Sequence, residues 1–122
     1  MQDFSELTIE QLEQNVCQRV KALYQTHLGH QIHQVSCKLI AHTLTIVVED
    51  SITHLENFLA KNNQYDLAKQ VRLNLLKGLE PHLKILIEAA ANVPVVDVLC
   101  DSVLDTGRTS IVAVLGAMPE LS

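Results

Sequence analysis

The sequence predicts an α+β fold, in which two β-hairpins form a four-stranded sheet that packs on one long helix. In residues 63–91 the apolar positions fall at steps of three and four, so they form one helical stripe that must be covered: Leu67, Val71, Leu75, Leu79, Leu83, Leu86 and Ala90. On both sides of this segment apolar and polar residues alternate with a period of two, which is typical of strands. The expected order is helix, hairpin, short helix, long kinked helix and hairpin.

The composition is that of one soluble globular domain, residues 1–122, whose ends at 1–7 and 116–122 we expect to fray. Hydrophobic residues make up 48% of the chain and aromatic residues 3%, so the core must consist of Leu, Val, Ile and Ala. The net charge of −5 offers no broad basic surface for phosphate groups, so nucleic acid is not an expected partner. An acidic N-terminus and the lack of any apolar run of about 18 residues predict no direct membrane insertion.

Three cysteines occur, at positions 17, 37 and 100. An odd number without close pairs makes no disulfide framework, so we expect a reducing, cytoplasmic compartment. Cys37 and Cys100 lie within strand patterns and have no neighbours in sequence that would lower their pKa. We therefore expect them to pack in the core rather than to serve a redox role.

The first helix is predicted to begin near Ile9, because Thr8 and Gln11 have the spacing of a capping box. It is predicted to end near Leu28, because Gly29 favours the positive φ found at many helix ends. Its buried stripe comprises Leu12, Val16, Val20, Leu23 and Tyr24. Alternating residues then predict a hairpin over residues 34–48, with its turn at Ala41 and His42.

A second capping box, Thr53 to Glu56, opens a short helix. The apolar residues of this helix are Leu55, Phe58 and Leu59. In the long helix, Tyr65 to Ala91, Pro81 predicts a kink, with a complete break as the alternative. About 28 helical residues would span ~42 Å, whereas a compact domain of this length is ~35 Å across. The long helix is therefore expected to overhang.

The final hairpin begins after Pro94. The first strand is predicted to place Val96, Val98 and Cys100 on one face, and on the other Val95, Asp97, Leu99 and Asp101. Residues 105–107 form the turn. The second strand runs from Thr109 to Leu115 and is predicted to point Val112 and Val114 away from the core.

Four stretches of the chain resemble the MpsC-like family of bacterial proteins. They are LYQTHLG, TLTIVVEDSIT, LLKGLEPHLKILIEAAANVPVVDVL and DTGRTSIVAVL, which together cover roughly Leu23 to Leu115. One departure is the turn after the first helix, where the family usually has basic residues with glycine and proline and this chain reads Gly29-His30-Gln31-Ile32-His33. The resemblance implies a small soluble accessory protein of a membrane-potential or inorganic-carbon uptake system, and it carries over no catalytic residues.

A metal site is one alternative. His27, His30 and His33 are spaced three apart and Cys37 follows four residues later, and imidazole and thiolate are ligands that suit zinc or copper. His27 ends a helix and His33 opens a strand, however, so the residues do not share one regular face. We therefore expect no structural metal and no cofactor, and we keep a small metal- or ligand-binding protein as the alternative function.

Asp97 and Asp101 are predicted on the same face of one strand, about two pleats apart, where two carboxylates can hold a cation or act as acid and base. Neither a nucleophile with its base nor a glycine-rich phosphate loop accompanies them, so a solvated role is favoured. Arg108 is expected to pair with Asp101 or Asp105 across the hairpin.

These features favour a non-enzymatic interaction or regulatory module, a dimeric accessory protein of a membrane transport or signalling system. A homodimer is expected because the second face of the sheet carries more apolar residues than a solvated face needs. These residues are Val47, Val95, Leu99, Val112 and Val114. The overhanging part of the long helix is the alternative interface. A protein partner within the transport or signalling complex is also expected.

Overall fold

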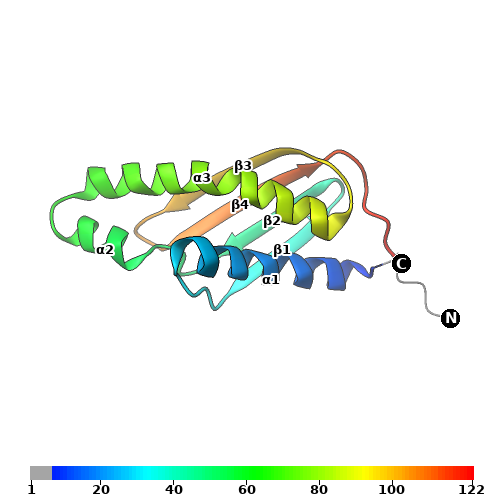
Figure 1. Cartoon of the computed structure of the whole chain (residues 1–122), viewed down its shortest axis with the longest axis horizontal. Helices are drawn as coiled ribbons and strands as arrows, with labels where there is room; N and C mark the ends of the chain where they lie inside the picture. Colours follow the sequence, from blue (N-terminus) through cyan, green and yellow to red (C-terminus); the bar gives the residue numbers. More distant parts are fainter. Residues whose placement is uncertain (1–6) are drawn as a thin grey trace.

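The sheet has four antiparallel strands and helices on one face, as the computed structural model shows for residues 7–122, the part of the chain it describes (Figure 1). The elements are α1 (Ile9–Leu28), β1 (Val35–Ile40), β2 (Thr43–Val48), α2 (His54–Lys61), α3 (Tyr65–Ala91), β3 (Val95–Val103) and β4 (Arg108–Leu115). The predicted α+β class and the predicted order of elements are confirmed.

Each hairpin supplies one edge strand and one central strand, in the order β1-β2-β4-β3. The central strands pair antiparallel, with Leu44 opposite Ala113 and Thr45 opposite Val112. Successive residues of a strand point to opposite faces, so this register directs the Leu44 row toward the helices and the Thr45 row away from them. The pairing of one hairpin with the other joins segments that are far apart in the sequence.

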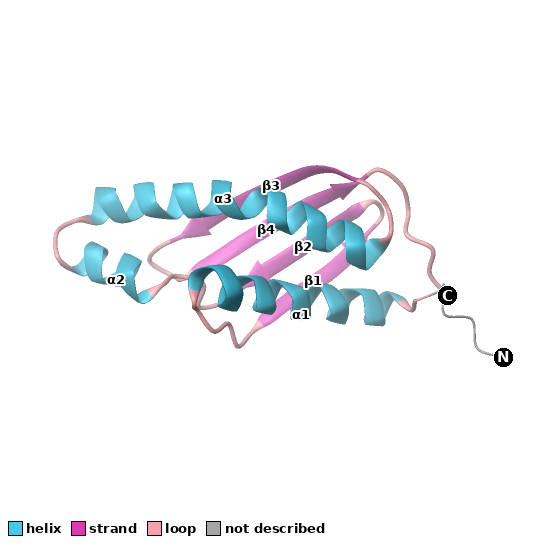
Figure 2. Ribbon diagram, in the orientation of Figure 1, coloured by secondary structure: helices cyan, strands magenta, loops and turns pink. Residues whose placement is uncertain are grey.

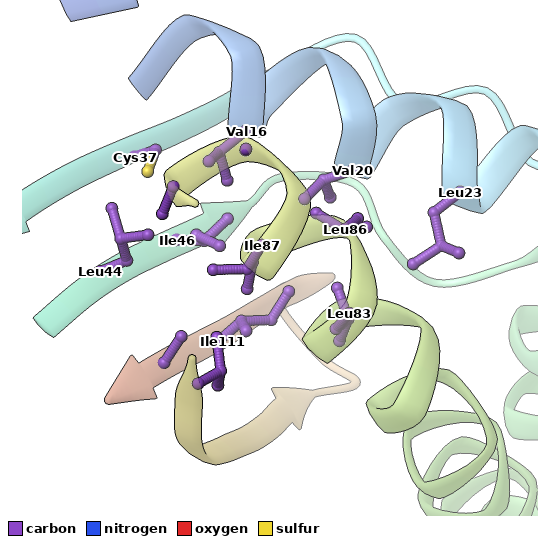
Figure 3. Close-up of a cluster of buried hydrophobic side chains, with 14 of the residues drawn as sticks. Val16, Val20, Leu23, Cys37, Leu44, Ile46, Leu83, Leu86, Ile87 and Ile111 are labelled. Atoms are coloured by element: carbon purple, nitrogen blue, oxygen red, sulfur yellow. The ribbon is translucent and has the colours of Figure 1, made fainter. Parts of the chain in front are cut away.

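The core lies between the sheet and the pair α1 and α3, which contact each other on the same face of the sheet (Figure 2). Figure 3 shows its centre, where side chains of both helices meet those of the central strands. Those labelled include Val16, Val20, Leu44, Ile46, Leu83, Ile87 and Ile111. Each fully buried aliphatic side chain of this kind stabilises the fold by about 1.5–3 kcal/mol.

Both capping boxes form as predicted. The Thr8 hydroxyl accepts a hydrogen bond from the Gln11 backbone N–H, and the Gln11 side chain accepts one from the Thr8 N–H at 2.9 Å. Thr53 and Glu56 repeat this arrangement at the start of α2. Gly29 adopts a φ of 60° at the end of α1, which confirms the predicted end of that helix.

The buried face of α3 changes direction along the helix. In the C-terminal half the predicted stripe is confirmed by the buried residues Leu79, Leu83, Leu86 and Ala90. In the N-terminal half the predicted Leu67, Val71 and Leu75 are wrong, because the residues buried there are Ala68, Arg72 and Leu76. These first turns reach past the end of the sheet and pack on α2 instead (Figure 1). Because α2 lies in a different direction from α3 than the sheet does, a different face of α3 is buried there.

α3 is continuous through Pro81 over 27 residues, so the alternative of a complete break is wrong. Proline removes one N–H donor and crowds the carbonyl four residues earlier, at Lys77. Both Pro81 and Lys77 lie on the exposed side of the helix, where water can replace the lost hydrogen bond. The predicted kink stays a prediction, whereas the overhang is visible in Figure 1.

A β-bulge between Val95 and Asp97 interrupts the alternation of β3. It turns Val95 into the core, where the side chain is 3% exposed, and leaves Val96 61% exposed. The predicted faces of Val95 and Val96 are therefore wrong, because a bulge adds one residue and inverts the alternation before it. Asp97, Leu99 and Asp101 are exposed, as predicted.

The two ends of the described chain lie together. Leu7 forms a parallel bridge with Leu121, and the Ser122 N–H donates a hydrogen bond to the Leu7 carbonyl at 2.9 Å. Leu121 is partly buried against the core. Fraying at 1–7 and 116–122 stays a prediction, and residues 1–6 lie outside the described residues.

Candidate functional site

Within residues 7–122 no helix covers the second face of the sheet (Figure 2). We call this surface the open face and define it by the outward residues of the four strands. Its two central strands contribute Thr43, Thr45, Val47, Arg108, Ser110, Val112 and Val114, with Arg108 at the end of β4. Most of these side chains are β-branched, so they form an even surface of methyl groups with few long polar side chains.

Four of the five residues predicted for an interface lie on the open face. Val47, Val112 and Val114 are half-buried on the central strands, and Leu99 is 61% exposed on the edge strand β3. Val95 does not lie there, because the bulge turns it into the core. Alternation along the strand identified the four residues, and no simple sequence signal marks the bulge.

Charges stand at the two edges of the open face. Lys38 of β1 is opposite Thr45, and that row continues through Val112 to Leu99 of β3. Asp97 and Asp101 lie one outward position to either side of Leu99. A cation on one edge and two carboxylates on the other therefore bracket the apolar centre.

Arg108 pairs with Glu49, at 2.5 Å from Nε to Oε1, so the predicted partners Asp101 and Asp105 are wrong. The register explains the difference, because β4 begins beside the end of β2 and brings Arg108 to the residue that follows that strand. Arg108 is 61% exposed. An exposed pair of this kind contributes less than ~1 kcal/mol.

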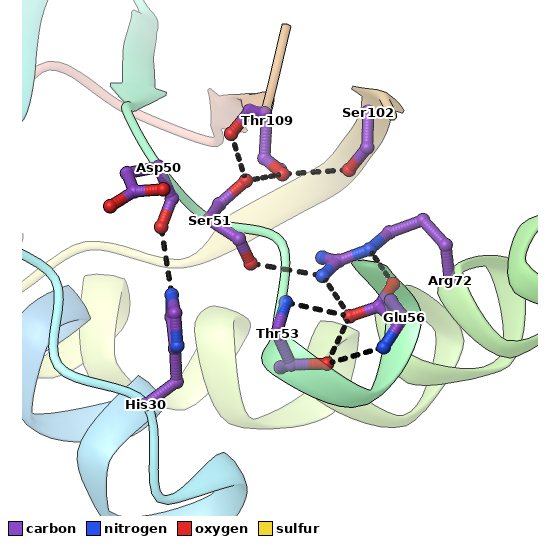
Figure 4. A network of polar contacts seen from close by, with 9 residues as sticks. His30, Asp50, Ser51, Thr53, Glu56, Arg72, Ser102 and Thr109 are labelled. Atoms are coloured by element: carbon purple, nitrogen blue, oxygen red, sulfur yellow. Dashed lines mark hydrogen bonds and ion pairs between the residues drawn. The ribbon is translucent and has the colours of Figure 1, made fainter. Parts of the chain in front are cut away.

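The largest polar cluster lies where α2 and α3 meet the end of the sheet (Figure 4), and its central side chains Ser51, Glu56, Arg72 and Thr109 are buried. Arg72 is 4% and Glu56 0% exposed, and they pair at 2.5 Å from Nη2 to Oε1 and 2.6 Å from Nε to Oε2. The second Nη2 hydrogen bond goes to the Ser51 carbonyl at 2.9 Å. Glu56 Oε1 also accepts from the Thr53 N–H and hydroxyl.

The cluster continues into the sheet through hydroxyl groups. Ser51 Oγ lies 2.6 Å from Thr109 Oγ1, which lies 2.7 Å from Ser102 Oγ. Tyr24 OH and Arg72 Nη1 are buried without a partner in hydrogen-bonding geometry. Burial raises the pKa of Tyr24, although nearby Arg72 and Thr109 lower it in part. This network binds the N-terminal turns of α3 to the sheet.

The Arg72–Glu56 pair was not predicted from the sequence. One signal was present: Arg72 lies four residues after Ala68 and four before Leu76, so an arginine occupies the middle of a row of small and apolar residues. Glu56 gave no such signal, because its place in the capping box of α2 already accounts for a glutamate there without any ion-pair partner. Only the packing of α2 on α3 shows that the two side chains meet.

α2 buries its one carboxylate and exposes two of its apolar side chains. Glu56 is buried, whereas Leu55 is 62% and Phe58 63% exposed. A second apolar surface lies on the other side of α3, where a groove of about 370 Å³ runs between α3 and the end of β3. Its apolar lining comprises Leu73, Leu76, Val103 and Leu104. We call the end of the molecule formed by α2 and the first turns of α3 the helical tip.

The predicted metal ligands do not converge. The His27 ring lies 4.3 Å from that of His82, and His30 Nε2 lies 2.7 Å from the Asp50 carbonyl oxygen. His33 is exposed, and Cys37 is buried in the core. Across residues 7–122 no group of three or more His, Cys, Asp or Glu side chains could hold a metal ion.

All three cysteines are free. Burial raises the pKa of the Cys37 thiol to about 12 and that of the Cys100 thiol to about 11. Both thiols are therefore protonated at neutral pH, and a thiol is a far weaker nucleophile than a thiolate. Both contribute to the hydrophobic core, as predicted from the strand pattern.

The fold and its surfaces define an α+β protein with one helix-covered sheet face, one open face and a largely buried polar cluster. The chain belongs to the MpsC family, because the model of that family, described as "Na+-translocating membrane potential-generating system (MpsC)", matches residues 8–117. No curated protein and no solved structure gives a significant match. No helix among the described residues is long and apolar enough to cross a membrane.

Proposed function

We propose that this chain is a non-enzymatic accessory protein of a Na+-translocating membrane system, and that it acts from the cytoplasm as a two-fold homodimer. Membership of the MpsC family supports the link to such a system. The Arg72–Glu56 pair and the Cys37 thiol support a non-enzymatic role, because the pair is buried and the thiol is protonated at neutral pH. Neither offers a reactive group to a substrate.

The observation that carries the dimer is the open face. Strands of 6, 6, 9 and 8 residues at a spacing of ~4.8 Å cover roughly 19 by 24 Å. Treated as flat, two such faces would bury about 900 Å² in total. Side chains make the real surface rougher and therefore larger, which brings the buried area near the ~1,000 Å² at which specific interfaces begin. Antiparallel sheets with one solvated face have polar residues there, whereas Val47, Val112 and Val114 are apolar.

Sedimentation equilibrium tests the dimer. We expect an assembly of twice the 13.6 kDa chain at micromolar concentration, and a monomer for the variant Val112→Lys/Val114→Lys, because four added charges would be brought together across the axis. The matched control is Gln18→Lys/Gln25→Lys, which adds the same charge to exposed positions of α1. A monomer of the unaltered chain at high micromolar concentration would contradict the proposal. A dimer that survives Val112→Lys/Val114→Lys would move the interface to the helical tip.

A measurement in cells tests the accessory role. We expect that deletion of the chain lowers the Na+-dependent membrane potential reported by a voltage-sensitive dye. The unaltered chain and the Gln18→Lys/Gln25→Lys control should restore the potential, and Val112→Lys/Val114→Lys should not. If a variant shown to be monomeric fully restored the membrane potential, the dimer would not be needed for the accessory role. An unchanged potential after deletion would contradict the role itself.

A further inference from the structure

We infer that two copies stack their open faces about a two-fold axis that runs parallel to the strands, between β2 and β4. Lys38 of each copy then faces the partner's Asp97 and the partner's Asp101. This inference rests on the proposed dimer and specifies its geometry. The carrying observation is the placement of charge at opposite edges of one face.

The strand order makes this axis possible. The sheet has an even number of strands and its middle lies between β2 and β4. Rotation about an axis parallel to the strands therefore places β1 over the partner's β3 and β2 over the partner's β4. The rotation leaves positions along the strands unchanged, so each row of residues meets the same row of the partner.

The charges become complementary in that arrangement. Lys38 shares its row with Leu99, so it lies over the partner's Leu99 and between the partner's Asp97 and the partner's Asp101. Each acid is two residues away along the strand, about 7 Å, which the long lysine side chain can reach. The strands of two packed sheets cross at about 30°. At the edge of the sheet this angle shifts Lys38 by only ~4 Å along the partner's β3, toward one of the two acids.

The other axis in the plane of the interface, at right angles to the strands, gives the opposite result. It places β1 over the partner's β1 and β3 over the partner's β3, so Lys38 lies over the partner's Lys38 and acids lie over acids. Like charges across an interface oppose association. Charge therefore selects the axis, while the apolar rows supply contact area for either one.

The geometry has a consequence for docking. The helical tip projects beyond one end of the sheet (Figure 1). An axis parallel to the strands keeps both tips at the same end of the dimer, so two exposed pairs of Leu55 and Phe58 face one side. An axis at right angles would send the tips to opposite ends.

Charge reversal tests the axis, with sedimentation equilibrium at low ionic strength as the readout. Lys38→Asp should weaken the dimer at least ~10-fold, and so should Asp97→Lys/Asp101→Lys, because each brings like charges together. The triple variant Lys38→Asp/Asp97→Lys/Asp101→Lys exchanges the charges of the two edges within one chain. It should return the dimer Kd to within ~3-fold of the unaltered chain.

Each outcome decides the inference. Parent variants that dimerise as tightly as the unaltered chain would overturn the axis, because the axis at right angles only exchanges one pair of like charges for another. A triple variant as weak as its parents would also overturn it, because with β1 over β3 the exchanged charges form attractive pairs. If Val112→Lys/Val114→Lys still abolished that dimer, the proposed dimer through the open face would stand without this geometry. A monomeric unaltered chain would overturn both. All three positions are exposed, and circular dichroism checks that each variant is folded.

Discussion

The two halves of α3 are held to the molecule by different interactions. The C-terminal half packs an apolar stripe of Leu79, Leu83 and Leu86 on the sheet. The N-terminal half reaches past the sheet and is held by the buried pair Arg72 and Glu56, with hydroxyl groups of Ser51 and Thr109 beyond it. The stabilisation from apolar contact depends mainly on the area buried, whereas that from the ion pair depends on the presence of both partners and on their geometry.

This difference between the two halves of α3 predicts which substitutions the fold tolerates. A buried ion pair contributes little net stability compared with an apolar pair of similar volume, yet removal of one partner leaves an uncompensated charge. The N-terminal half is therefore oriented by its polar cluster more than it is stabilised by it. The C-terminal half supplies most of the buried apolar area of the helix.

The largest effect is expected at the apolar half. Leu79→Asp places a charge in the core where the side chain is 4% exposed, and its cost exceeds the stability margin of a small domain. We expect loss of the cooperative melting transition in far-UV circular dichroism. The control is Leu67→Asp in the other half, at a position 43% exposed, which should cost less than ~1 kcal/mol. Equal effects of the two substitutions would show that the helix faces are assigned wrongly.

The second largest effect on stability is expected in the N-terminal half of α3, at the buried ion pair. Glu56→Ala leaves the Arg72 guanidinium buried without its carboxylate and should lower the free energy of unfolding by ~3–5 kcal/mol in urea titrations. The double variant Glu56→Leu/Arg72→Met removes both charges at similar volume and should be more stable than Glu56→Ala. A double variant less stable than Glu56→Ala would contradict this, and would mean that the other contacts of Arg72, such as its hydrogen bond to the Ser51 carbonyl, outweigh its unpaired charge.

A moderate effect is expected at alkaline pH, in the core under the C-terminal half. Burial raises the pKa of Cys37 from 9.0 to about 12 and that of Cys100 to about 11. The unfolded thiols ionise above about pH 9 while the folded thiols stay protonated, so the folded state binds more protons there and stability falls as pH rises. This contribution is complete below pH 9 and is lost up to about pH 11–12. Urea titrations of Cys37→Ala/Cys100→Ala should show a weaker decline, and an equal decline would contradict the assignment.

The smallest effect is expected at the histidines near the helical tip. His27, His30 and His33 do not converge on one point, so a chelator should leave the melting temperature unchanged. The measurement is a thermal melt with and without chelator on protein purified without a histidine tag. Stoichiometric zinc or copper by elemental analysis, lost together with stability in His30→Ala/His33→Ala, would support the alternative metal-binding function.

Local signals in the sequence determined much of this protein. Two capping boxes, one at Thr8 and one at Thr53, together with Gly29, located helix ends, because capping depends on residues three or four positions apart. Alternation located the strands and placed Val47, Leu99, Val112 and Val114 on the open face, because the two faces of a strand follow from backbone geometry alone. The α+β class follows from these local patterns.

Tertiary structure decided what local patterns leave open. The bulge at Val95 reverses the face of one predicted interface residue, and the position of α2 turns the first half of α3 so that Arg72, not Val71, is buried. The pairing of β2 with β4 places Lys38 and Asp97 at opposite edges of one face. Each of these results joins segments far apart in the chain, and their contacts depend on the packing of the whole core rather than on the residues next to them.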